Sequence, residues 1–487
     1  MARAARRKRT DAKPKLKTAV VVVHGMGEQR PMETLWGLVE ALWIQDPDHC
    51  TDEFEVYSKP DRIADSYELR RITTRYSLKS PKKRADFFEL YWAHRMQGNT
   101  VAAVFQAAKA LLWRSPDNVP QRLMGVWVVG WIVLALAVVL SMALPLGLEK
   151  LLGLFGYELR DGVWATAAVA LFALFNLGFG GLLKNWVGPV AGDAARYLSP
   201  HPDNIAAREA IRKQAVQLIE ALHRTNAYDR IVVVGHSLGT VVAYDALSFA
   251  FGQIPHPDLK RAHEDPATAA ALDRLEDLTR RISAAKPDKA PVLRVEYRDA
   301  QRDYLRLLAK ARRRDGRTPL WLVSDFVTTA SPLSKADVLI ARNEERFRRR
   351  IKRRDVAVSP PFLEKSQWRN GLPRFSYPER RPRGPHHAAV FAPTVWTNLY
   401  FATEQIVLGD VIAGPVAPLF GPAVLDVRLD RDRKAFRHLD YWAPGQGGRL
   451  APAWIRALRK AVNLRELDEA ALWGEQAAAL EVDANGV

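Results

Sequence analysis

The stretch 229–247 (DRIVVVGHSLGTVVAYDAL) constrains the fold more than any other part of the chain. Ile231–Val234 is a continuous β-branched run, which is typical of a strand buried on both faces in a parallel sheet. It leads directly into Gly235-His236-Ser237-Leu238-Gly239 and then into a helical pattern. A strand, a G-x-S-x-G turn and a helix in succession predict a sharp elbow that lifts the Ser237 hydroxyl out of the sheet. Gly235 and Gly239 are required because the turn is too tight for side chains.

A second glycine-rich turn follows an earlier strand pattern. Thr18–Val23 (TAVVVV) is predicted to be another buried strand, and it ends in His24-Gly25-Met26-Gly27-Glu28. Gly25 and Gly27 would let the backbone approach a substrate closely. Taken alone, this pattern is compatible with an ordinary glycine turn. Its combination with the elbow favours a functional loop.

A histidine near the end of the chain is the candidate base for Ser237. Leu320–Val327 and Val395–Phe401 are predicted to be further strands, and His438 is the only one of the 11 histidines that follows the second of them. A histidine there can accept the Ser237 proton through one ring nitrogen while an acid orients the other. A surface histidine is the alternative interpretation. His236 lies inside the elbow and is not expected to reach back to the serine.

The acidic partner is left open by the sequence. Glu404 lies three residues after the predicted strand 395–401, where its carboxylate would be held close to the sheet edge. Asp410 has the commoner side chain and a glycine-flanked loop, but that loop must fold back. Asp325, in the preceding strand, is a weaker third choice. Residue type favours Asp410 slightly over Glu404.

Two long uncharged runs interrupt the chain between the early strands and the elbow. Leu123–Leu148 comprises 26 residues and Gly162–Leu183 comprises 22. Each can cross the hydrocarbon core of a bilayer as a helix, which takes about 20 residues. Buried core helices are the alternative, although such helices rarely stay uncharged for so long. We therefore predict a transmembrane hairpin.

The charge around these runs predicts how the hairpin is oriented. The connection 149–161 carries two basic residues and three acids, whereas basic residues and the basic tail 1–17 flank the pair on the outside. The positive-inside rule therefore places both termini and the catalytic domain in the cytoplasm. The single cysteine, Cys50, fits a reducing compartment and excludes a disulfide framework and a Cys-based zinc site.

Most of the net charge of +18 is carried by two basic tracts, residues 1–17 and 342–354. Basic tracts suit nucleic acid, anionic lipid or plain solvation. No recognition motif accompanies them, so nucleic-acid binding is not expected. Beside a membrane anchor, Arg346–Arg354 would suit anionic headgroups, and a solvated loop is an equally good interpretation.

Several segments together carry a family resemblance: HGMGEQ, GHSLGTVVAYDAL, VTTASPLSKADVL, WTNLYF and HLDYW. They resemble the α/β-hydrolase superfamily and are most similar to its lipase-like serine esterases, which include inositol deacylases and DDHD-type phospholipases. The likeness covers residues 18–95 and about 190–445. It implies an oxyanion hole formed by backbone N–H groups of Met26 and Leu238. Glu404 stands where DDHD-type enzymes have an aspartate, which is a departure from their pattern.

The predicted architecture is an α/β fold with a doubly wound, mostly parallel α/β-hydrolase sheet and an inserted two-helix transmembrane hairpin. The predicted divisions are a basic tail (1–17), the first part of the hydrolase domain (18–122), the hairpin (123–183) and the main part of the domain (184–480), with a helical insertion at about 256–316.

The predicted function is a membrane-anchored serine hydrolase that cleaves carboxylic esters through an acyl-enzyme, without a metal or an organic cofactor. Location at the bilayer makes a lipid or another acylated amphiphile the expected substrate. Two alternatives remain open. The same triad can transfer the acyl group to an alcohol or thiol, and a non-catalytic membrane scaffold can keep the same fold.

Overall fold

The structure is a computed structural model of the 487-residue chain. The residues it describes are 17–25, 30–50, 56–63, 67–79, 82–96, scattered positions between 113 and 135, 197, 202–287, 289–341, 343–364, 372–402, 410, 412–429, 438–443 and 451–474.

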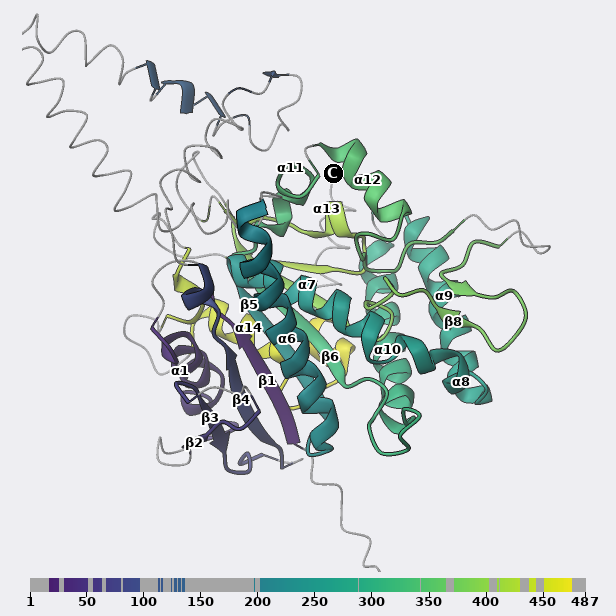
Figure 1. The fold of residues 1–487 in the computed structure, drawn as a ribbon, viewed down its shortest axis with the longest axis horizontal. Helices are drawn as coiled ribbons and strands as arrows, with labels where there is room; N and C mark the ends of the chain where they lie inside the picture. The colour runs from purple at the N-terminus through teal and green to yellow at the C-terminus, as the bar shows by residue number, and fades with distance from the viewer. Residues whose placement is uncertain are drawn as a thin grey trace, which may run out of the picture.

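In this described part of the chain, eight strands form one sheet in the order β10-β9-β6-β5-β1-β4-β3-β2 (Figure 1). The pairs from β10 through β4 are parallel, whereas β3 and β2 are added to β4 in antiparallel fashion. The strands are β1 (Lys17–Val23), β2 (Val56–Pro60), β3 (Arg70–Thr74), β4 (Arg84–Leu90), β5 (Arg230–His236), β6 (Val323–Thr329), β9 (Val395–Phe401) and β10 (Leu425–Leu429). A separate antiparallel pair consists of β7 (Ser376–Tyr377) and β8 (Gly384–Pro385).

Helices connect the strands. The α-helices are α1 (Glu33–Val39), α6 (Ile205–Thr225), α7 (Leu238–Gln253), α8 (Leu259–Ala262), α9 (Pro266–Ser283), α10 (Ala290–Lys310), α11 (Ala336–Leu339), α12 (Glu344–Lys352), α13 (Ala417–Phe420) and α14 (Ala453–Val462). A π-helical turn, η1 (Glu40–Ile44), continues α1. The short 3₁₀ turns are η3 (Ala93–Met96), η6 (Pro202–Asn204), η7 (His256–Asp258), η8 (Pro332–Lys335) and η9 (Asp440–Trp442).

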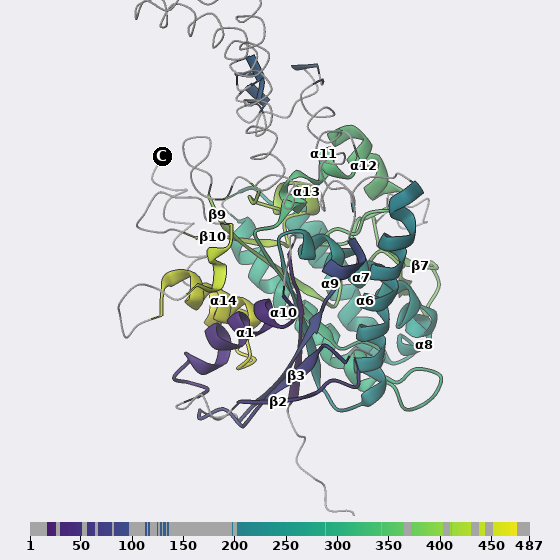
Figure 2. The same cartoon turned by 60° about the vertical axis from the view of Figure 1, so that its left-hand side comes forward.

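The sheet is covered by helices on both faces, which explains why β1 and β5 contain long apolar runs. Along β1, Val20 and Val22 point to the core shared with α1 and α14, whereas Val21 and Val23 point to the core shared with α6, α7, α9 and α10. Figure 2 shows α1 and α14 on one side of the strands and α6 and α7 on the other. Side chains alternate along a strand, so burial of both faces favours apolar residues at successive positions.

The strands predicted from the apolar runs are present, and the α/β class is confirmed as a mostly parallel mixed sheet with surrounding helices. The segment 256–316 contains α8, α9 and α10. The sequence did not predict the edge strands β2 and β10.

The predicted transmembrane hairpin lies almost wholly outside the described residues: 162–183 entirely, and 123–148 except for a few positions between 124 and 135. Among the helices that are described, none combines the length and the apolar character needed to span a bilayer.

Candidate active site

Ser237 is the single residue between β5 and α7, and it lies at the carboxyl edge of the parallel strands. Its backbone has φ 51° and ψ −129°, a conformation that non-glycine residues rarely adopt. The Ser237 N–H donates to the carbonyl oxygen of Thr329 at the end of β6, 2.9 Å away. Strained backbone of this kind persists only where its surroundings fix it, and it concentrates at functional sites. The neighbouring strand fixes the elbow predicted from the sequence.

Two glycines of the elbow are enforced by close backbone contacts. A Cβ atom on Gly239 would lie 2.3 Å from the carbonyl oxygens of Val23 and His24, and one on Gly235 would lie 2.7 Å from the Cα atom of Thr240. These obstacles are backbone atoms, which cannot rotate away. Gly239 therefore lets the first turn of α7 pack directly against the end of β1.

His438 and Asp410 meet Ser237 in the described structure. The Ser237 Oγ atom lies 2.8 Å from His438 Nε2, and His438 Nδ1 lies 3.0 and 3.1 Å from the two Asp410 carboxylate oxygens. The exposed fractions of Ser237, His438 and Asp410 are 1%, 5% and 0%. A carboxylate only accepts, so Nδ1 carries the imidazole proton and Nε2 is left to accept the serine proton. This is the tautomer that a general base needs.

Asp410 is held as a carboxylate by its hydrogen-bond donors. Its Oδ1 atom accepts from the backbone N–H groups of Ile412 (3.0 Å) and Ala413 (3.1 Å), and its Oδ2 atom accepts from the Tyr441 hydroxyl at 2.8 Å. Burial raises the pKa of Asp410, but hydrogen bonds from His438, Tyr441 and Ala413 outweigh it and lower that pKa below its ordinary value. The acid therefore stays ionised next to the imidazole.

The loop that carries Asp410 is fixed from two sides. The Lys335 ammonium of η8 donates to the carbonyl oxygens of Ile412 (2.7 Å) and Ala413 (3.0 Å). Just beyond, the Asp426 carboxylate accepts from the backbone N–H of Val416 and from the Asn398 amide, which also donates to the Gly414 carbonyl. Residues 412–416 are thus tied to the sheet, and Asp410 lies at its edge beside His438.

His236 supports the base although it is not itself placed to deprotonate the serine. Its Nε2–H donates to the backbone carbonyl of His438 at 2.8 Å, and Trp442 packs edge-on against its ring at 4.7 Å. Burial lowers the pKa of His236 to about 3, with the neighbouring His438 adding to the effect. A neutral imidazole therefore anchors the main chain of the base.

Tyr441, three residues after His438 in the chain, also holds the Asp410 carboxylate. Its hydroxyl donates to Asp410 and accepts the backbone N–H of Phe401, the last residue of β9, at 3.1 Å. Sequence reasoning assigned no role to His236 or Tyr441. His236 lies within the motif GHSLG and Tyr441 within HLDYW, and this position was the signal in the sequence that could have pointed to their roles.

The early glycine loop lies against the elbow. An added Cβ on Gly25 would lie 3.0 Å from the Ser237 Cβ atom. His24 Nδ1–H donates to the Gly25 carbonyl at 2.8 Å, while its Nε2 accepts the Trp92 backbone N–H at 3.0 Å. Burial lowers the pKa of His24 to about 4, so it is neutral here. Met26 and Gly27 lie outside the described residues, and Leu238 begins α7 directly after the serine.

Of the other two candidate acids, Asp325 and Glu404, only Asp325 lies among the described residues. Asp325 is excluded as the orienting acid, because its carboxylate is buried against Arg230 (3.1 Å) and Arg302 (2.9 Å) near the amino end of β6. The pKa of Asp325 is lowered, since these guanidinium groups outweigh the opposing effect of burial. Glu404 lies outside the described residues.

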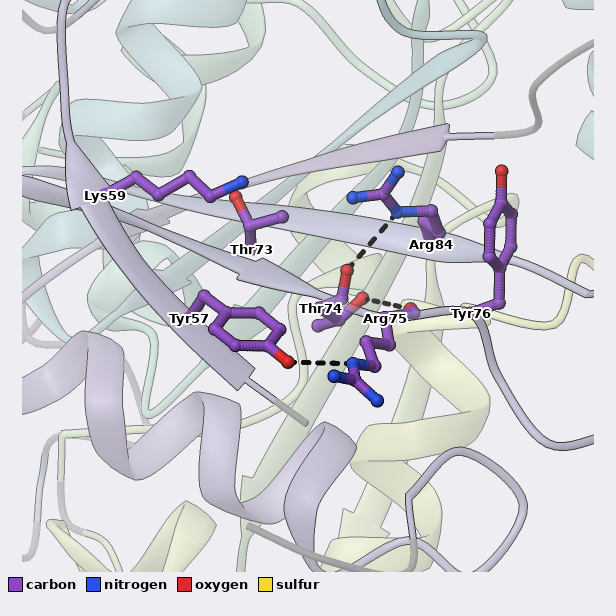
Figure 3. Close-up of a pocket in the computed structure, with 7 residues that line it drawn as sticks. All are labelled: Tyr57, Lys59, Thr73, Thr74, Arg75, Tyr76 and Arg84. Carbon is purple, nitrogen blue, oxygen red and sulfur yellow. Dashed lines mark hydrogen bonds between the residues drawn. The ribbon is translucent and has the colours of Figure 1, made fainter. Parts of the chain in front are cut away.

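A surface hollow of about 400 Å³ lies elsewhere, over the antiparallel edge strands (Figure 3). Its lining residues are Tyr57, Lys59, Thr73, Thr74, Arg75, Tyr76 and Arg84. Arg75 donates to the Tyr57 hydroxyl at 2.8 Å and Arg84 to the Thr74 carbonyl at 3.3 Å. Arg84 is the first residue of β4, so the hollow lies at the amino edge, away from Ser237.

Within the described ranges, no cluster of His, Cys, Asp or Glu side chains is arranged to hold a metal ion. Comparisons of the chain with protein-family models, with curated proteins and with solved structures find no match.

Proposed function

We propose that the protein is a serine hydrolase of carboxylic esters in which Ser237 is the nucleophile, His438 the base and Asp410 the residue that orients it. The observation that carries the proposal is the continuous hydrogen-bonded chain from Ser237 Oγ through both nitrogens of His438 to Asp410. Nucleophile, base and orienting acid within hydrogen-bond reach are the defining geometry of activated serine.

The reaction proceeds in two balanced steps. Ser237 Oγ attacks the ester carbonyl carbon while its proton passes to His438 Nε2, and the imidazolium then protonates the departing alcohol oxygen. Water then attacks the acyl carbon and gives a proton to the same nitrogen. The bond from the acyl carbon to Ser237 Oγ breaks, the imidazolium returns the proton to Oγ, and the carboxylic acid is released. The N–H at the start of α7, on Leu238, and the N–H of Met26 are proposed to stabilise the negative carbonyl oxygen.

The arrangement also supports the α/β-hydrolase fold. The serine follows the central strand β5, and its partners come later in the chain in the order Ser237, Asp410, His438. That order and the strand–elbow–helix unit are features of that superfamily. Helices on both faces of the sheet are consistent with its doubly wound form.

We further propose that residues 123–183 anchor the enzyme in a membrane, with its body and termini in the cytoplasm. Trp92 and Tyr197, which stand on either side of this segment in the sequence, lie side by side with ring centroids 6.4 Å apart. The Trp92 ring also stacks on His24 at 5.1 Å, directly beside the elbow. The described residues Trp92 and Tyr197, which stand before and after the two uncharged runs in the sequence, therefore lie next to the candidate site, which supports a lipid or another acylated amphiphile as substrate.

Labelling with a fluorophosphonate probe tests the hydrolase proposal. The detergent-solubilised full chain should be labelled, whereas Ser237→Ala and His438→Ala should lose labelling. Ser248→Ala, a change in α7 at a hydroxyl that donates to the Tyr244 carbonyl at 2.9 Å, should keep it. Absence of labelling in folded wild type, or persistent labelling of Ser237→Ala, would refute the proposal.

Product analysis then tests the reaction and the substrate class. Phospholipids and short soluble esters are supplied at equal ester concentration, with and without an added alcohol acceptor. We expect release of free fatty acid from the lipid. Transfer of the acyl chain to the alcohol as the main product would instead assign an acyltransferase.

A further inference from the structure

The basic tract predicted at 342–354 contains a docked amphipathic helix, α12. Its inner side is fixed by Phe347, which is 1% exposed and packs edge-on against Phe420 of α13 at 5.4 Å. Its start is capped by Asn343, whose side chain accepts the Arg346 backbone N–H at 2.9 Å. The charged side chains therefore occupy a surface of defined geometry.

Arginines from this helix surround a hollow of about 380 Å³ between α11 and α12. The lining residues are Ile340, Ala341, Arg346, Arg349, Arg350 and Arg353. Arg350 is oriented by donating to the Ile340 carbonyl at 2.9 Å, and Arg349 pairs with Glu345. The hollow thus combines guanidinium groups with a small apolar wall.

The charge around the hollow is only partly compensated. Residues 344–353 contain six basic side chains and two acids, a net charge of +4. The two acids are taken by neighbouring arginines of the same helix, in the pairs Glu344–Arg348 and Glu345–Arg349. Among the described residues, no carboxylate pairs with Arg346, Arg350 or Arg353. These groups are suited to bind an external anion.

The hollow lies at the edge of the sheet that carries the candidate active site. β6 ends at Thr329 beside the elbow, and the chain then runs through η8 into α11 and α12. Figure 1 shows these two helices beyond the ends of the strands toward which β1 points. Lys335 of η8 ties this region to the Asp410 loop through the carbonyl of Ala413. Leu339, next to the hollow, is 39% exposed.

We propose that this arginine-lined hollow binds the phosphate of an anionic phospholipid at a membrane surface. Guanidinium groups bind phosphate oxygens in a bidentate manner, and the exposed Leu339 beside them suits an interfacial lipid better than a free anion. The site lies at the same edge as Trp92 and Tyr197, which flank the segment with the two uncharged runs. Binding there would hold the Ser237 edge toward the bilayer, and it does not depend on catalysis.

Calorimetric titration of the full chain in non-ionic detergent tests the site directly. The probes are dioctanoyl phosphatidic acid, dioctanoyl phosphatidylcholine and inorganic phosphate. The test variant is Arg346→Gln/Arg353→Gln, whose two side chains are exposed, and the matched control is Lys59→Gln/Arg75→Gln, which removes the same charge at the opposite edge. Thermal melting verifies that each variant is folded, and Arg353→Gln alone replaces the double variant if that variant melts early.

We expect phosphatidic acid to bind and the test variant to bind it about 25-fold more weakly, about fivefold for each charge. The control should stay within about twofold of wild type, given that its charges lie at the other edge. Equal binding of phosphatidylcholine, or equal weakening in both variants, would overturn the proposal. Inorganic phosphate binding as tightly as the lipid would identify a soluble anion as the ligand and would overturn the membrane assignment. This titration measures binding and not turnover, so it is independent of the labelling test of Ser237. A chain that binds phosphatidic acid here but is not labelled by the fluorophosphonate probe would refute the proposed hydrolase function and leave the lipid site standing.

Discussion

Replacement of Asp410 by asparagine is the sharpest test of the proposed triad, because the structure determines how the new side chain must sit. Oδ1 of Asp410 accepts two backbone N–H groups, from Ile412 and Ala413. An amide nitrogen cannot accept, so in Asp410→Asn the remaining oxygen must keep that position. The amide NH₂ then takes the place of Oδ2 and faces Tyr441 and His438.

The magnitude follows from the imidazole tautomer. His438 Nδ1 then faces the retained Oδ1 at 3.0 Å and a donor NH₂ in the place of Oδ2 at 3.1 Å, so the carboxylate charge that held the proton on Nδ1 is lost. This favours the tautomer with the proton on Nε2, which points at Ser237 and cannot accept the serine proton. Wrong-tautomer substitutions of this kind in serine triads reduce kcat by about 10⁴, and we expect a loss of 10³–10⁴, about 4–5.5 kcal/mol. The backbone contacts of the loop persist, so the melting temperature should change little.

The assay is the rate of fluorophosphonate labelling and of ester hydrolysis, with circular dichroism melts alongside. Glu404→Gln is the matched control, because it neutralises the other acid that the sequence leaves open. It should keep activity within about threefold of wild type, because in the proposed triad Asp410 and not Glu404 orients His438. If Glu404→Gln lost activity while Asp410→Asn retained more than a tenth of it, the reasoning from the structure would be wrong.

Three further predictions rest on single features of the described structure. Gly239→Ala should destabilise the protein by several kcal/mol in denaturant unfolding, since its Cβ meets two carbonyl oxygens at 2.3 Å, whereas Gly252→Ala in the same helix, with open space around its Cβ, should stabilise it by up to about 1 kcal/mol. Tyr441→Phe should lower kcat by about 10- to 150-fold, because a hydrogen bond to a carboxylate contributes about 1.5–3 kcal/mol, and an unchanged kcat would contradict the positioning role of Tyr441. Burial lowers the pKa of five histidines to about 3 or 4. Between pH 6.5 and 4 the unfolded chain therefore binds more protons than the folded one, and the free energy of unfolding should fall by about 2 kcal/mol per histidine at pH 5. A free energy of unfolding that stays constant over this pH range in urea titrations would contradict this. These histidines are His24, His223, His236, His263 and His386.

The central strands and the elbow could be predicted because their signals are local. The β-branched runs in β1 and β5 are continuous, and G-x-S-x-G fixes where one strand ends. The order of Ser237 and His438 along the chain also sufficed to pair them. The edge strands could not be predicted in this way. Four of the five residues of β2 are exposed, so its sequence carries no apolar run of the kind that marks a buried strand.

The choice between the acids could not be made from the sequence, because it depends on how a loop folds back. Lys335, Asn398 and Asp426 fix that loop, and each of them is distant from Asp410 in the sequence or carries no signal of its own. Asp325, the weakest of the three candidates, has a structural role instead. A carboxylate in a buried strand suggests chemistry, but here it is neutralised by two arginines that join β5 and α10.

The contacts divide the candidate site into two parts: a group of residues that are close to one another in the sequence, and a serine that is far from them in the sequence. Asp410, His438 and Tyr441 lie within 31 residues of one another, and their mutual bonds belong to the segment that follows β9. Ser237 is 201 residues from His438 and is positioned instead by β5 and β6. The acid–base pair is therefore built independently of the nucleophile, and the neutral His236, which donates to the His438 carbonyl, joins the two parts. Removal of the Ser237 hydroxyl should leave the pair in place, whereas loss of the His236 imidazole should separate it from the serine.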